Sequence, residues 1–255
     1  MSTGAFPLNP DNRRAIVVLQ EHEIEKCAYE KCSGGILVDS EAYVLQFPVS
    51  DRPNMPQALQ NILDMNQARP GSTLIQSPFD LDVYEEVSSA PQQFALAKHM
   101  YFSILCKHLG AREVIVEQVD MKTSSAMHGI EVKGNKNGCV AGADIKKTEC
   151  EKLRAKMSLH DKFTGGPPDL EKAEQLLRGK KLIADSNMRS LIEMRRDGAN
   201  QITSRELVLS LSSEANNNLK VVGKLKVPGF IKLSTSYESV LNNLFEYTLT
   251  VKVEF

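Results

Sequence analysis

The 255-residue sequence lacks the long apolar runs and the excess of one charge that mark several classes of protein. Nowhere do about 18 apolar residues follow one another, and the first residues, MSTGAFPLNPDNRR, have no charged-then-apolar signal layout. We therefore expect neither export by a recognisable signal nor anchoring by a membrane-spanning helix. The 31 Lys and Arg residues nearly balance the 32 Asp and Glu residues. This balance argues against a dedicated nucleic-acid-binding protein, which is normally basic.

Cysteines are few, and their arrangement suits neither a disulfide framework nor a zinc site. The five cysteines are odd in number and scattered: Cys27, Cys32, Cys106, Cys139 and Cys150. Cys27 and Cys32 stand close together, but no second close pair completes a set of zinc ligands. Free cysteines of this kind are typical of a reducing compartment, so we predict a cytoplasmic protein.

The familiar enzyme signatures are also missing. The sequence has no GxSxG, HExxH or GxGxxG motif and no P-loop. His160 and Asp161 are adjacent, and neighbouring side chains on a helix diverge, so they make a poor catalytic dyad. The sequence therefore favours a non-catalytic protein without a cofactor. An enzyme whose site is assembled from scattered residues stays open as an alternative.

What the sequence does contain is the composition of a globular protein, with 42% hydrophobic and 25% charged residues. Hydrophobic periodicity, proline and glycine divide the chain into short elements. The predicted strands are 15–20, 35–40, 43–47, 112–121 and 127–135. The predicted helices are 56–65, 90–110, a zone from 148 onward, 168–179 and 185–198.

The C-terminal part alternates apolar and polar residues over three stretches, 205–213, 219–237 and 245–255. Such alternation indicates strands with one buried and one solvated face, and consecutive strands of this kind favour an antiparallel meander. We therefore predict an α+β fold, with a mostly antiparallel sheet dominated by a C-terminal β-meander (about 205–255). About four or five helices flank this sheet. A single domain is expected over 1–255, with a subdomain boundary near 110 or 145 as the alternative.

Four lysines share one side of the predicted ribbon 219–237: Lys220, Lys224, Lys226 and Lys232. This lysine face is either a solvated surface that discourages strand-to-strand aggregation or a binding surface for an anionic membrane or partner. The long alternating ribbon resembles, in pattern only, the pore-forming proteins of the gasdermin and perforin-like type. No motif transfers to this chain residue by residue. Pro228 and Gly229 interrupt the ribbon and predict a bend or bulge.

A metal-dependent nuclease is the competing interpretation. Asp120 ends one predicted strand, and Glu131 and Lys133 lie on the next. This arrangement resembles the D…(D/E)xK signature of restriction-type nucleases. The resemblance implies that Asp120 and Glu131 hold Mg²⁺ and that Lys133 orients water or stabilises charge. It covers only about residues 90–160, and Glu131 and Lys133 also fit a solvated pair on one strand face.

Together these patterns predict a non-catalytic cytoplasmic interaction or assembly protein that acts on a protein partner or on further copies of itself. Its specific form is a membrane-active oligomer that meets an anionic membrane surface through the lysine face. Nucleic acid is the expected partner only under the nuclease alternative.

Overall fold

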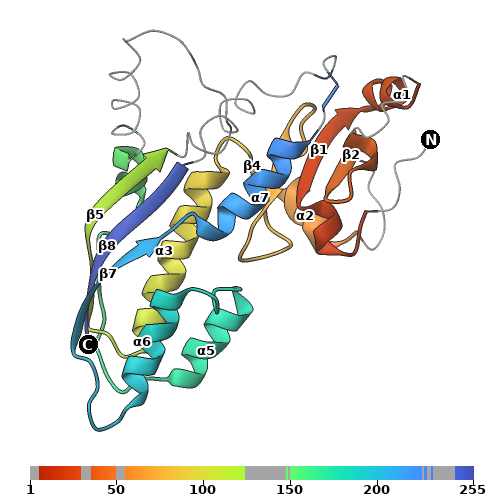
Figure 1. Ribbon diagram of the computed structural model, residues 1–255. Coiled ribbons are helices and arrows are strands. Elements are labelled where there is room, and N and C mark those ends of the chain that lie inside the picture. The colour runs from red at the N-terminus through yellow and green to blue at the C-terminus, as the bar shows by residue number, and fades with distance from the viewer. Residues whose placement is uncertain are drawn as a thin grey trace. The chain divides into compact units, whose positions relative to one another are not determined.

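The computed structural model describes residues 6–29, 36–49, 55–123, 148, 150–225, 227–228, 231 and 245–255. The chain divides into two compact units (Figure 1). The first unit comprises Met1–Pro91 with Glu214–Leu244, and the second comprises Gln92–Ser213 with Phe245–Phe255. The single domain expected from the sequence stays a prediction. In the part of the chain that the structure describes, no helix is both long and apolar enough to cross a membrane.

The first unit is a mixed sheet with helices. Its elements are η1 (Pro10–Arg13), β1 (Ala15–Gln20), α1 (Glu21–Tyr29), η2 (Ile36–Val38), β2 (Ala42–Phe47), α2 (Gln57–Asp64), β3 (Thr73–Gln76), β4 (Tyr84–Glu86) and most of α7 (Ser213–Lys224). The strand order is β2-β1-β3-β4. Strands β1 and β2 are parallel, whereas β1–β3 and β3–β4 are antiparallel. The parallel pair requires a crossover connection, and α1 lies in that connection.

Strand β1 is the centre of the first unit because its sequence, AIVVLQ, is apolar on both faces. All of its residues except Gln20 are buried. Ile16 and Val18 pack with Tyr84 and with Ala58 and Ile62 of α2. Burial of this apolar surface stabilises the unit by about 25 cal/mol per Å².

The second unit holds an entirely antiparallel sheet. Its elements are most of α3 (Ala90–His108), β5 (Glu113–Thr123), helical residues 150–156, β6 (His160–Lys162), α5 (Leu170–Gly179), α6 (Ser186–Arg196), β7 (Ser204–Ser210) and β8 (Phe245–Glu254). The strand order is β6-β5-β8-β7. Strands β5 and β8 pair from Glu113↔Glu254 to Thr123↔Phe245, with a bulge after Val116.

Buried cations tie the helices of this unit together. Lys98 of α3 is fully buried, and its Nζ lies 2.8 Å from Asp185 Oδ2 at the start of α6. Asp185 also caps α6, because its side chain accepts hydrogen bonds from two backbone N–H groups of the first turn. Arg195, at the other end of α6, donates from Nε to the Leu109 carbonyl oxygen at 3.0 Å. Helix α6 is therefore fixed at both ends.

The predicted α+β class is confirmed, including the mostly antiparallel pairing. Strands β1, β2, β5, β7 and β8 and helices α2, α3, α5 and α6 lie where the sequence predicts them, to within a few residues. The strand predicted at 35–40 is wrong, because Ile36–Val38 forms a 3₁₀ turn.

The predicted ribbon 219–237 is wrong over its first part, because 213–224 forms helix α7. Ala215, Leu219 and Val222 are buried and recur with helical spacing. Val221 and Val222 are neighbours and both are buried, which a strand with one solvated face does not allow. The sequence of this segment fits the period of a strand and that of a helix, and packing in the folded protein stabilises the helix. Residues 226, 229–230 and 232–237 of the ribbon lie outside the described residues.

Candidate functional site

The second unit contains a cavity of about 360 Å³, which we call the α3 pocket. Its walls are Leu96, His99, Met100, Ser103, Ile104, Lys156, Met157, Ser158, Asp161 and Phe163. The volume lies at the small end of the range that ligand-binding pockets occupy, roughly 300–1,000 Å³. Half of these residues are apolar, and the other half are polar groups that line the same cavity. This combination is typical of binding sites.

Helix α3 and strand β6 supply three of the polar groups of the α3 pocket. His99 and Ser103 are four residues apart on α3, so they occupy one face of the helix, a turn apart. Asp161 is the middle residue of the short strand β6. Because side chains alternate along a strand, its neighbours His160 and Lys162 point the other way, and both contact Glu113 Oε1, at 3.2 and 3.3 Å.

The Asp161 carboxylate organises the pocket. Ser103 Oγ donates to Asp161 Oδ2 at 2.5 Å, and Ser158 Oγ donates to Oδ1 at 2.5 Å. Hydrogen bonds from a hydroxyl to a carboxylate are charge-assisted and stronger than bonds between neutral groups. Both hydroxyl protons are therefore engaged. The carboxylate can still accept further bonds, since its two oxygens offer about four lone-pair positions.

His99 is the unusual group of the pocket. His99 is only 4% exposed, and its Nε2 atom is buried without a hydrogen-bond partner among the described residues. Burial lowers the pKa of His99 below 6.5, and the charge of Asp161 opposes this shift only in part. His99 is therefore neutral at pH 7. A buried, unpaired ring nitrogen costs stability, so a ligand that bonds to it recovers that cost.

Cys106 lies one turn beyond Ser103 on α3 and does not line the pocket. The residue is fully buried, and burial together with the charge of Asp161 raises the pKa of its thiol. The thiol is thus protonated and unreactive, because the thiolate is the nucleophilic form. At the rim, Lys156 Nζ donates to Gln92 Oε1 at 2.7 Å.

The residues proposed from the sequence do not belong to this pocket. Asp120 is exposed on β5, and its carboxylate accepts two bonds from Gln118 Nε2, at 2.9 and 3.0 Å. Glu131 and Lys133 lie outside the described residues, so the Mg²⁺ site stays a prediction. Among the described residues, no group of three or more His, Cys, Asp or Glu side chains is placed to hold a metal ion.

The lysine face of the sequence analysis is not a strand face in its described part. Lys220 and Lys224 lie on α7, four residues apart, with Lys224 exposed and Lys220 half-buried. Lys226 and Lys232 lie outside the described residues. The binding role of all four lysines stays a prediction.

The sequence does not single out His99, and it draws attention to Asp161 only as the neighbour of His160. The one readable signal was the four-residue spacing of His99 and Ser103. Asp161 reaches Ser103 across 58 residues of sequence, through the pairing of β6 with β5. No local pattern reveals that encounter.

Comparison of the chain with known protein families, with curated proteins and with solved structures finds no match.

Proposed function

We propose that this is a non-catalytic interaction protein whose α3 pocket receives a lysine or arginine side chain of a partner protein. The observation that carries the proposal is the unpaired, deeply buried His99 Nε2 beside the Asp161 carboxylate. Both groups accept hydrogen bonds when His99 is neutral with its proton on Nδ1, and Asp161 supplies negative charge. A cationic group that donates several bonds complements them.

The walls of the pocket support the same ligand class. Leu96, Met100, Ile104 and Phe163 line the pocket together with the acceptors. The methylene stem of a lysine or arginine packs against apolar surface while its charged end meets polar groups. A cavity of about 360 Å³ has room for such a side chain.

The geometry favours binding over catalysis. In nucleophilic catalysis the base lies within hydrogen-bond reach of the nucleophile. Here the Ser103 hydroxyl donates to Asp161, whereas His99 Nε2 has no bond to Ser103 or to any other described group. His99 and Ser103 are thus not arranged as base and nucleophile.

The proposal is tested with small probes and the full-length protein. We expect n-butylammonium to perturb the ring resonances of His99 in an NMR titration, and to do so at lower concentration than uncharged n-butanol. Asp161→Asn should weaken n-butylammonium binding by roughly tenfold or more, because it removes a charged acceptor. Asp120→Asn, which changes an exposed carboxylate outside the pocket, should leave binding unchanged. Equal binding of the two probes, or of both variants, would contradict the proposal.

A membrane-active role is the second candidate, and one observation favours it. The β5–β8 pair ends at Thr123↔Phe245. Residues 124–147 follow β5, and residues 226–244 precede β8, so both segments join the strand pair at this same end. Lysines attract a protein to an anionic leaflet with about 1 kcal/mol each. The described part of the lysine face, Lys220 and Lys224, lies on α7, whose last residue leads towards 226–244.

Co-sedimentation and dye release with vesicles containing phosphatidylserine test this second candidate over a range of salt. Binding should be strongest at low salt, and the triple change of Lys220, Lys224 and Lys226 to Glu should abolish it. Binding that ignores both salt and the triple change would count against the lysine face. These lysines do not line the α3 pocket, so the vesicle experiment tests only the membrane role and the probe titration tests only the binding of a lysine or arginine side chain.

A further inference from the structure

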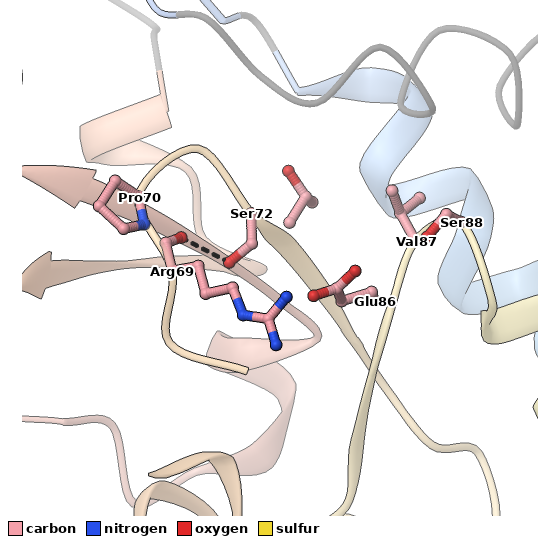
Figure 2. A pocket seen from close by; sticks show the side chains of 7 residues that line it. Arg69, Pro70, Ser72, Glu86, Val87 and Ser88 are labelled. Carbon is pink, nitrogen blue, oxygen red and sulfur yellow. Dashed lines mark hydrogen bonds between the residues drawn. The ribbon is translucent and has the colours of Figure 1, made fainter. Parts of the chain in front are cut away.

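The first unit contains a second, smaller pocket of about 210 Å³, which we call the β4 pocket (Figure 2). Its walls are Arg69, Pro70, Ser72, Thr73, Glu86, Val87 and Ser88. They come from the loop before β3, from β3 itself and from the end of β4. The α3 pocket shares none of these residues, so the two pockets can bind ligands independently.

Groups of opposite charge face each other across the β4 pocket. The Arg69 side chain extends towards the Glu86 carboxylate in Figure 2, yet within the described residues neither forms an ion pair. Arg69 Nε donates to the Asn66 carbonyl oxygen at 3.1 Å, which holds the side chain while leaving its terminal nitrogens to other partners. The pocket thus presents a donor of bidentate hydrogen bonds on one side and a carboxylate on the other.

Thr73 is the third functional group of this pocket. The residue is 2% exposed, and its Oγ1 atom is buried without a hydrogen-bond partner among the described residues. Its neighbour Ser72 differs, because Ser72 Oγ shares its one proton between the carbonyl oxygens of Gln67 and Arg69, at 3.0 and 2.7 Å. A threonine hydroxyl both donates and accepts, so Thr73 can serve either end of a charged ligand.

The loop that carries Arg69 and Ser72 is held in place. Gly71 has φ +78°, a left-handed conformation that favours glycine. Its N–H donates to the Val18 carbonyl oxygen at 2.8 Å, and the Ser72 N–H donates to the Arg69 carbonyl oxygen at 3.0 Å. The turn is thereby fixed against β1. A fixed turn presents its side chains with little ordering cost on binding.

We propose that the β4 pocket binds a small zwitterion of the α-amino acid class. The ligand carboxylate accepts hydrogen bonds from the Arg69 guanidinium, and the ligand ammonium donates to Glu86. The Thr73 hydroxyl gains the partner that it lacks. A cavity of about 210 Å³ is below the usual range for drug-sized ligands, which favours an amino acid with a small side chain. A simple anion fits less well, because it faces the Glu86 carboxylate without compensation.

The experiment is an isothermal titration of the full-length protein with glycine and L-alanine, beside the half-ligands acetate and methylammonium. We expect a saturable heat for the zwitterions and at least tenfold weaker binding of each half-ligand, since each keeps only one charged contact. Arg69→Gln and Glu86→Gln should each weaken zwitterion binding to a similar extent. Arg14→Gln, which changes an arginine of the same unit outside the pocket, should have no effect.

Thr73→Val separates binding from folding. Valine has nearly the shape of threonine, so removal of an unpaired buried hydroxyl should raise the melting temperature of the free protein. The same variant should show a smaller rise on addition of glycine than the wild type does. The proposal is overturned if acetate or methylammonium binds as tightly as glycine, if Glu86→Gln leaves glycine binding intact, or if no titration gives a saturable heat.

Discussion

The buried pair of Lys98 and Asp185 offers the sharpest test of how the second unit is held together. The Lys98 side chain is 0% exposed and that of Asp185 only 10%, and their nearest charged atoms are 2.8 Å apart. Lys98 Nζ also lies 3.2 Å from Ser213 Oγ. Lys98→Met preserves the apolar stem and removes the charge. The Asp185 carboxylate is then left in the interior without its cation.

The cost of that change follows from desolvation. Removal of one partner of a buried ion pair typically costs about 3–5 kcal/mol, because the remaining charge stays uncompensated. Asp185 keeps two backbone N–H bonds from the first turn of α6, at 3.0 Å each, which soften the loss. We therefore expect a value near the lower limit, about 3 kcal/mol. With a urea m value of about 2 kcal/mol per M, the midpoint moves down by about 1.5 M.

Urea unfolding followed by far-UV circular dichroism measures this shift. Lys172→Met is the matched control, because Lys172 makes an exposed pair with Asp169 at 2.7 Å that should contribute almost nothing. The double variant Lys98→Met with Asp185→Asn should recover part of the loss, because no buried charge remains unpaired. A midpoint for Lys98→Met within about 0.3 M of the Lys172→Met midpoint would refute the reasoning.

Four further predictions concern single residues. The native pKa of His99 lies below its unfolded value, so unfolding takes up a proton as the pH falls below about 6.5, and the free energy of unfolding declines. His99→Gln should make the urea midpoint fall less between pH 7.5 and 5.5 than it does in the wild type. Parallel midpoint curves for the two proteins would contradict this prediction. Cys106 should resist iodoacetamide in the native protein and react after unfolding, as mapped by mass spectrometry. Gly110→Ala should destabilise by about 1–3 kcal/mol, since Gly110 has φ +80° and an added Cβ would collide with a backbone carbonyl oxygen; Gly179→Ala, where space is open, is the control in the same urea experiment. Asp120→Ala should leave stability unchanged, and neither it nor the wild type should cleave DNA in Mg²⁺; cleavage by the wild type alone would favour the nuclease alternative.

The extent to which the sequence predicts the fold depends on whether one periodicity dominates a segment. Strand β1, apolar from Ala15 to Leu19, and β8, with Tyr247, Leu249, Val251 and Val253 in phase, have only one reasonable interpretation. Helix α7 has two, because Leu219 and Val221 satisfy the period of a strand while Ala215, Leu219 and Val222 satisfy that of a helix. The choice is made by burial against the rest of the unit, which local sequence does not contain.

The candidate site was less predictable than the fold, for a related reason. His99 and Ser103 could be placed on one helix face, but the sequence does not say whether that face is buried. The negative charge beside this face comes from Asp161, which lies on the three-residue strand β6. Hydrogen bonds between distant segments depend on the tertiary fold, and a single sequence carries no record of them.

The interlaced path of the chain has a consequence for synthesis. Strand β8 lies between β5 and β7 in its sheet, yet it follows β7 only after helix α7 and the rest of 214–244 have been made. A growing chain on the ribosome therefore holds β5 and β7 without the strand that joins them, with the backbone groups of both strands unpaired on that side. The sheet of the second unit cannot be completed before residues 245–255 leave the ribosome, so this unit folds late. Until then the unpaired edges of β5 and β7 must not pair with strands of other chains.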